Sequence, residues 1–271
     1  MPTNRSTSKR LARVFNEGFV VKDIVEPLAS FDVRTKVSEV HEFVQAKKFK
    51  VVGIRDQGHV VGYAKSEQLG ADSCRDSLCM IEADQILPDT APLADVVLAL
   101  EKYDRLFVSW LGEIAGIVTR TDMQKPPVRM WLFGMITLIE MRFTQLIERV
   151  HGDESWQEFV SEGRLSKARV LQEERQRRNQ TVKVLDCLQF SDKGQVIARS
   201  SELRGLTKFE SRGQVEKVFK GLERLRNNLA HSQDIVSNDW EVIVLLTQNL
   251  ERVVSGPPAL DESSAAADTT A

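Results

Sequence analysis

The feature that most constrains the fold of this 271-residue chain is an internal repeat in its first half. When the sequence is shifted by 54 positions, apolar residues and glycines of one segment fall on similar residues of the next. The matched pairs are Val52 and Leu106, Ile54 and Val108, Gly58 and Gly112, Gly62 and Gly116, and Leu69 and Met123. The pattern predicts two copies of one small unit, each of which leaves an apolar face that its twin covers.

An apolar pattern of helical period precedes each copy. At the same shift, Val37, Val40, Val44 and Phe49 fall on Ala91, Ala94, Leu98 and Tyr103. The spacing of three to five residues is what one buried helix face requires. We therefore expect each copy to contain a helix, a strand, a glycine turn, a second strand and the start of another helix.

The most specific stretch of the repeat is Gly116-Ile-Val-Thr-Arg-Thr-Asp122. Together with the repeat, over residues 18–126 (copies at about 18–70 and 72–126), it resembles the tandem CBS domain pair, also called the Bateman module. In that family two copies pack sheet to sheet and form two clefts for adenosine-containing ligands. The resemblance implies that Asp122 binds the ribose hydroxyls of AMP, ADP, ATP or another adenosyl nucleotide, and that Thr119 contacts ribose or phosphate.

The residue types suit these roles. An ionised carboxylate accepts two hydrogen bonds from a vicinal diol, and a hydroxyl at a helix start adds to the free backbone donors that favour phosphate. The alternative is that Thr119 and Asp122 only cap a helix, which stabilises it by about 1 kcal/mol. In the first copy Lys65 replaces the Thr and Gln68 replaces the Asp. Lys65 can attract a phosphate, but without a carboxylate we expect no ribose site there.

The second half of the sequence predicts a helical domain at 128–255, which gives an α+β chain overall. Pro126-Pro127 closes the first domain, because tandem prolines do not continue a helix. Helices are expected at 131–150, at 165–179, from about 214 onward and at 239–254, with a turn at Ser191–Gly194. The 131–150 helix is apolar on more than one face, so it either packs centrally in a bundle or makes a subunit contact. Residues 1–17 and 256–271 are expected to be flexible.

Within the helix that begins near 214, Arg226 and Asn227 are followed by His231. This Arg-Asn-x-x-x-His order resembles the signature of the HEPN family of all-helical domains, whose active members are metal-independent endoribonucleases that leave 2′,3′-cyclic phosphate ends. The resemblance implies that His231 is the general acid or base, that Arg226 stabilises the phosphorane and that Asn227 orients the phosphate. It also implies a homodimer whose paired sites bind RNA and need no metal.

The surroundings of the motif add two expectations. Arg226 falls at the edge of an apolar stripe and needs a charged partner, and Glu140, in the preceding apolar helix, is the expected one because family members carry an acid there. The alternative for His231 is a helix-end histidine, stabilised by the helix dipole and bonded to a carbonyl.

The charge pattern points to the second half as the part that binds an anion. The net charge is only −2, yet Lys and Arg outnumber Asp and Glu by sixteen to eight between Arg164 and Arg226. The stretch from Arg164 to Lys183 either follows an RNA backbone or is a solvated, self-paired helix. Three cysteines without metal-ligand spacing and the lack of an evident membrane span or leader favour a cytoplasmic protein.

Two functions from different classes remain. The first is a metal-independent ribonuclease regulated by a nucleotide bound to the repeat. The second is a non-catalytic nucleotide-sensing scaffold whose helical domain binds a partner.

Overall fold

A computed structural model describes residues 10–248 except 12, 16, 71–72 and 208. The chain is of mixed α+β type, as predicted. It divides into a repeat unit, Val14–Trp131, and a helical unit that begins at Leu132. Of the segments expected to be flexible, most of 1–17 and all of 256–271 lie outside the described residues.

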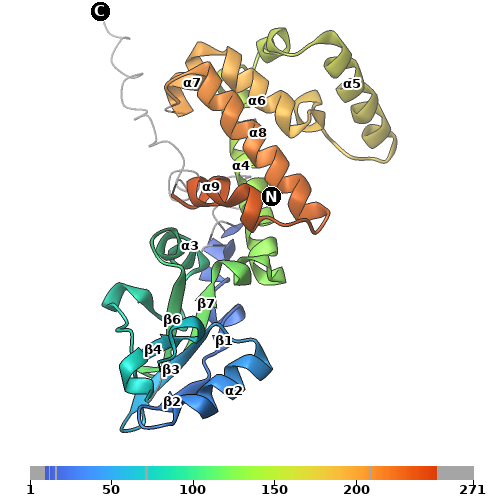
Figure 1. Ribbon diagram of the computed structural model, residues 1–271. Helices are drawn as coiled ribbons and strands as arrows, with labels where there is room; N and C mark the ends of the chain where they lie inside the picture. The colour runs from blue at the N-terminus through green and yellow to red at the C-terminus, as the bar shows by residue number, and fades with distance from the viewer. Residues whose placement is uncertain (1–9, 12, 16, 71–72, 208, 249–271) are drawn as a thin grey trace, which may run out of the picture. The chain divides into compact units, whose positions relative to one another are not determined.

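Among its described residues, the repeat unit contains two small sheets, each accompanied by an α-helix (Figure 1). The first sheet has the order β1-β7-β6-β5, formed by Glu26–Pro27, Glu113–Thr119, Arg105–Trp110 and Ile86–Pro88. The second has the order β2-β3-β4, formed by Ser30–Asp32, Val51–Asp56 and His59–Lys65. The helices are α2, Val37–Lys47, and α3, Leu93–Lys102. In each sheet the short strand before the helix pairs parallel to the first strand of an antiparallel hairpin.

The two hairpins confirm the shift of 54 positions. Strands β3 and β4 have the same bounds as β6 and β7 once 54 is added, and each hairpin has an irregularity at the equivalent place in its register. Both turns place two successive residues at positive φ: 51° and 90° at Gln57 and Gly58, 50° and 88° at Leu111 and Gly112. Two positive φ values in a row define the tight hairpin turn that glycine at the second position allows.

The predicted match of the helices at this shift is wrong by two residues. Val37, Val40 and Val44 form the buried face of α2, and the buried face of α3 contains Leu93, Val96 and Leu100, which lie 56 positions later. The predicted equivalents Ala94 and Leu98 are only half-buried. The reason is local: α2 is one residue longer than α3, and its connection to the next strand, which begins with Lys48 in the left-handed region, is also one residue longer.

The two copies exchange short segments. Strand β1, near the start of the first copy, pairs with β7 of the second, and Cys79, near the start of the second copy, pairs with Tyr63 of the first. A side chain at Gly116 would place its Cβ 2.3 Å from Val25, and one at Gly62 would place it 2.4 Å from the Cys79 carbonyl oxygen. These glycines therefore permit the close approach of each exchanged segment.

The helical unit contains the part of α4 after Trp131 and five further α-helices among the described residues (Figure 1). Their bounds are Pro126–Val150 for α4, Glu162–Arg177 for α5, Phe190–Arg199 for α6, Ser201–Thr207 for α7, Arg212–Ala230 for α8 and Val236–Gln248 for α9. The prediction that Pro126-Pro127 precedes the helix is wrong, because the two prolines form the first turn of α4. A first turn needs no backbone donors from them.

Helix α4 has at least two neighbours, as its apolar faces predicted. The Phe219 ring of α8 lies 4.9 Å from the Phe143 ring of α4, and the Lys193 ammonium of α6 lies 2.9 Å from the Glu140 carboxylate of α4. Helix α4 is also the one helix of the described residues that is long and apolar enough to cross a membrane, with a mean hydropathy of 1.2. Within this apolar window 44% is buried, including Leu132, Met135 and Ile136.

The predicted turn at Ser191–Gly194 is wrong, because these residues form the first part of α6. The polar and small residues gave a turn signal, but Asp192 caps the helix by accepting a hydrogen bond from the Gln189 N–H, at 3.2 Å. A Cβ at Gly194 would lie 2.4 Å from Phe219. The glycine therefore lets α6 and α8 approach closely.

Candidate functional site

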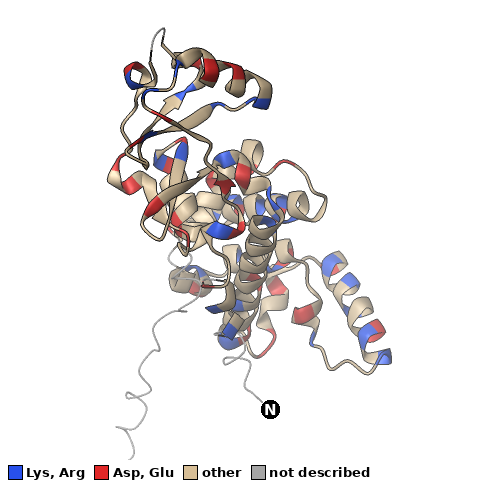
Figure 2. Cartoon of the chain, turned by 90° about the horizontal axis from the view of Figure 1, so that it is seen from below, with Lys and Arg blue, Asp and Glu red and all other residues tan. Residues whose placement is uncertain are grey.

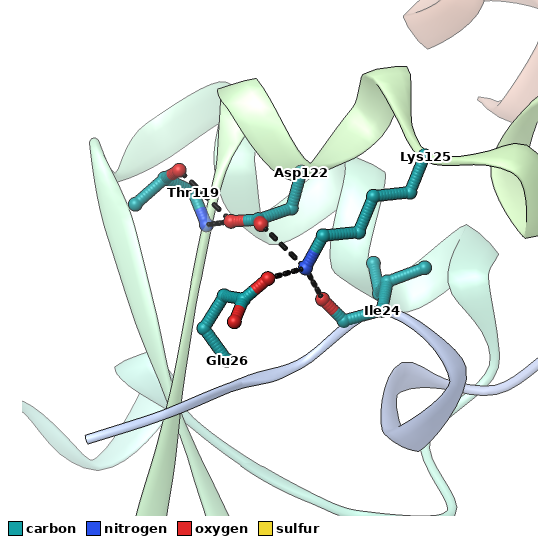
Figure 3. Close-up of polar contacts among 5 residues, drawn as sticks. All are labelled: Ile24, Glu26, Thr119, Asp122 and Lys125. Carbon is teal, nitrogen blue, oxygen red and sulfur yellow. Dashed lines mark hydrogen bonds and ion pairs between the residues drawn. The ribbon is translucent and has the colours of Figure 1, made fainter.

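The residues predicted to bind a nucleotide lie where β7 ends and the short 3-10 helix η5, Arg120–Gln124, begins (Figure 3). One carboxylate oxygen of Asp122, Oδ2, accepts hydrogen bonds from the Thr119 N–H at 2.8 Å and from the Thr119 hydroxyl at 2.9 Å. The structure therefore confirms that the pair caps a helix. Only 11% of the Asp122 side chain is exposed.

The second carboxylate oxygen of Asp122 meets a partner that the sequence analysis missed. The ammonium of Lys125 lies 2.8 Å from Asp122 Oδ1 and also contacts the Glu26 carboxylate and the Ile24 carbonyl oxygen (Figure 3). Burial lowers the pKa of Lys125, but the hydrogen bonds and charges of Asp122 and Glu26 outweigh it, so the pKa is raised overall. The ion pair between Asp122 and Lys125 was predictable, because the two residues are three apart in the sequence. The contact with Glu26 was not, because Glu26 and Lys125 are 99 residues apart.

The equivalent place in the first copy differs in charge and burial. Lys65 ends β4 and is half-buried, and Gln68 is exposed. No carboxylate of the first copy stands where Asp122 stands in the second. Lys65 therefore stays a predicted phosphate contact without a neighbouring ribose acceptor.

The Arg-Asn-x-x-x-His motif lies at the C-terminal end of α8. His231 caps that helix, and Ser232 after it has a φ of 54°, in the left-handed region. The Gln233 N–H donates to the Asn228 carbonyl at 2.9 Å, and the Ser232 N–H donates to the Leu229 carbonyl at 3.4 Å. This pair of bonds is a Schellman motif, which fixes the backbone at His231.

Arg226, Asn227 and His231 are all exposed. Among the described residues the Arg226 side chain has no ion pair, so the predicted pairing with Glu140 is wrong. Glu140 instead contacts the Lys193 ammonium at 2.9 Å. The misread turn explains the error, because Lys193 faces α4 only once α6 begins at Phe190. The predicted bond from the His231 ring to a carbonyl is also absent within the described part of the chain.

A buried acid that the sequence analysis missed connects α8 and α9. Asp239 is fully buried, and it accepts hydrogen bonds from Arg224 Nε and Asn228 Nδ2, both at 2.7 Å. Arg224 also donates to the Asn238 carbonyl at 3.1 Å. These bonds hold the last turns of α8 against α9.

The basic stretch predicted to follow RNA is largely paired within the protein. Figure 2 shows positive and negative residues interspersed along α5. The ion pairs are Arg164 with Asp192, Arg169 with Glu162, Arg177 with Glu173, Arg178 with Glu174 and Lys183 with Glu148. This arrangement favours a solvated, self-paired helix over an RNA track.

Comparison with solved structures finds CBS-domain proteins over the N-terminal part of the chain. CBSX2 in complex with AMP is 22% identical, with a TM-score of 0.35 over 39% of this chain and 92% of that one. A CBS-domain protein of unknown function from Thermoplasma acidophilum, TA0289, is 18% identical, with a TM-score of 0.34 over 42% of this chain and 75% of that one. A hemolysin-like protein containing a CBS domain, from Oenococcus oeni, is 15% identical, with a TM-score of 0.35 over 42% of this chain and 93% of that one.

No protein-family model and no curated protein matches the chain. The resemblance of the helical unit to HEPN domains stays a prediction.

Proposed function

We propose that the repeat unit senses an adenosine nucleotide and that the second copy holds it. The observation that supports this is the placement of Thr119 and Asp122 together at the end of β7. The aspartate offers the charged acceptor that a ribose diol needs, and the start of η5 offers backbone donors for phosphate. The titration of AMP into the full chain tests the proposal, and Asp122→Asn is expected to lose binding.

We further propose that the helical unit is a metal-independent endoribonuclease. The observation that supports this is the exposure of Arg226, Asn227 and His231 on the last turn and cap of α8. A guanidinium without an ion pair among the described residues is available to a phosphate, and an exposed imidazole is accessible to a substrate as a general acid or base. Glu140 takes no part in the proposed reaction, because it forms an ion pair with Lys193.

The proposed reaction uses the RNA 2′-hydroxyl as the nucleophile. His231 of one subunit of a homodimer removes its proton, and the oxygen attacks the adjacent phosphorus. The bond from phosphorus to the 5′-oxygen breaks, and this oxygen takes a proton from the protonated histidine of the second site. Arg226 stabilises the added charge on the phosphorane, and the products are a 2′,3′-cyclic phosphate and a 5′-hydroxyl.

Incubation of the purified full chain with single-stranded and structured RNA in EDTA tests the nuclease. The wild type is expected to give fragments with cyclic phosphate ends, and His231→Ala is expected to cut at least about 10²-fold more slowly. Arg199→Ala is the matched control, because Arg199 is an exposed arginine of the same unit that lies outside the motif. An equal rate for His231→Ala, or a dependence on added metal, contradicts the proposal.

We propose that nucleotide binding regulates RNA cleavage through helix α4. This helix begins at Pro126, in the repeat unit, and continues into the helical unit. Regulation requires that the nucleotide bind two conformations with different affinity. The ratio of cleavage rates with and without AMP measures it. A ratio of one in the wild type contradicts regulation. No cleavage with or without AMP favours the non-catalytic sensing scaffold, whose helical unit binds a partner.

A further inference from the structure

The Lys125 ammonium has all three of its donors occupied. Their acceptors are Asp122 Oδ1, the Glu26 carboxylate and the Ile24 carbonyl oxygen (Figure 3). An ammonium has three donors and no acceptor, so this arrangement satisfies it completely. It joins η5 to the segment that runs into β1.

This arrangement leaves Asp122 little capacity for a further ligand. A carboxylate offers about four acceptor positions. Thr119 takes two on Oδ2, and Lys125 takes one on Oδ1. A vicinal diol donates two hydrogen bonds, so it has to compete with the ammonium for Asp122.

The cluster formed by Thr119, Asp122, Lys125 and Glu26 occurs in the second copy of the repeat and has no counterpart at the equivalent place in the first. By the shift of 54 positions, Thr119, Asp122 and Lys125 correspond to Lys65, Gln68 and Ala71. Glu26 corresponds to Cys79, because each pairs with the second strand of the opposite hairpin. Packing of the repeat therefore does not require the charges, since the first copy replaces both acids with neutral residues.

Lys125 also directly precedes the first residue of α4. Its carbonyl oxygen accepts hydrogen bonds from the Val128 N–H at 3.1 Å and the Arg129 N–H at 3.2 Å. Pro126 and Pro127, which lie between Lys125 and Val128, have no backbone N–H and donate no hydrogen bond. One residue thus contacts the proposed ligand site through its side chain and fixes the first turn of α4 through its backbone.

We propose that Lys125 is a lock on the ligand site of the second copy: a ribose diol takes Asp122 from the ammonium, and the released Lys125 loosens the first turn of α4. This inference rests on the proposed nucleotide site and specifies how occupancy of that site is sensed. It makes Lys125 a competitor of the ribose, whereas a lysine near a bound nucleotide would otherwise be expected to attract its phosphate.

Calorimetric titration of the full chain with adenosine and with AMP separates the two roles. Lys125→Met is expected to bind adenosine at least about fivefold more tightly than the wild type, because the competitor is gone and site coupling is typically of this size or larger. Lys125→Arg keeps the charge and is expected to bind like the wild type. Lys102→Met, at the exposed end of α3, is the matched control and is expected to have no effect.

The outcomes distinguish the lock from the site. Adenosine affinity that is unchanged or weaker in Lys125→Met overturns the lock and leaves the nucleotide site standing, and weaker binding of AMP alone identifies Lys125 as a phosphate ligand. If no variant binds either compound, the nucleotide site itself is overturned, and the lock with it. Binding by Lys125→Met alone supports a stronger lock.

A second variant and a second measurement keep the test independent of folding. Glu26→Gln weakens the hold on Lys125 without touching Asp122, and it is expected to shift adenosine affinity in the same direction. Hydrogen exchange at the Val128 and Arg129 amides is expected to speed up when AMP saturates the wild type, and Lys125→Met without ligand is expected to reproduce that rate. Exchange that AMP leaves unchanged contradicts the relay to α4.

Discussion

Asp122 caps η5 with one carboxylate oxygen and meets Lys125 with the other, so one side chain serves both the fold and the proposed ligand. Its bond to Thr119 was predictable, because a cap depends on residues three apart in sequence. Its surroundings were not, since Glu26 reaches the site only through the exchange of β1. Glu140 shows the same limit: its partner Lys193 is set by packing of α4 against α6.

A pH-dependent contact also arises from the repeat at the residue scale. His59 and Glu113, at equivalent positions of the two hairpins, lie 2.9 Å apart. The hydrogen bond and the charge of Glu113 raise the pKa of His59 above 6.5. The pair therefore stabilises the fold fully below the unfolded-state pKa, and this contribution is lost as the pH rises through the higher folded-state value.

NMR titration of the His59 ring measures that pKa. In Glu113→Gln we expect it to fall toward 6.5, while the other histidines stay unchanged. The urea midpoint of the wild type should exceed that of Glu113→Gln at pH 5.5 and approach it at pH 8.5. Equal His59 titration in the two proteins contradicts the pairing.

At the scale of elements, the sequence predicted the two hairpins, the helix before each hairpin and the apolar stripe of α8, because each follows from a local period or a turn. It did not predict the short strands β1, β2 and β5. It misplaced the helix match by two residues and read the start of α6 as a turn. Ser191 to Gly194 carries polar and small residues, yet Asp192 and Lys193 are buried there. Only the packing of α6 against α4 and α8 decides that.

Gly194 tests this packing. Phe219, which a Cβ at Gly194 would meet at 2.4 Å, also packs against the rings of Phe143 and Phe190. We expect Gly194→Ala to lower the free energy of unfolding by about 1–3 kcal/mol. Gly205→Ala in α7, where a Cβ meets nothing within 4 Å, is expected to raise it by roughly 0.5–1 kcal/mol. Urea denaturation checks both, and a neutral Gly194→Ala contradicts the close approach.

The end of α8 allows a structural residue to be separated from a proposed catalytic one. Asp239→Ala removes the acceptor of Asn228 and Arg224, so we expect a loss of about 1–3 kcal/mol in unfolding free energy. His231 is exposed, so His231→Ala should change stability by less than about 0.5 kcal/mol. Thermal or urea unfolding ranks the two variants. If His231→Ala is the more destabilising, His231 holds the fold and is not free for catalysis.

At the scale of the whole molecule, two nearly symmetric copies carry one asymmetric charged cluster, and one helix runs from that cluster into the helical unit. The repeat and the helical composition were evident in the sequence. The lack of an ion pair for Arg226 among the described residues and the contacts of Lys125 were not, because both depend on segments far apart along the chain.

The number of nucleotides bound per chain is the most direct test of this account. Calorimetric titration of AMP into the wild-type chain should give one site, since only the second copy offers a carboxylate beside its hydroxyl. Asp122→Asn keeps an acceptor for the helix cap but removes the charge, and it should abolish that site, whereas Lys65→Met should leave it intact. Two sites per chain, or a single site lost in Lys65→Met and retained in Asp122→Asn, would contradict the account.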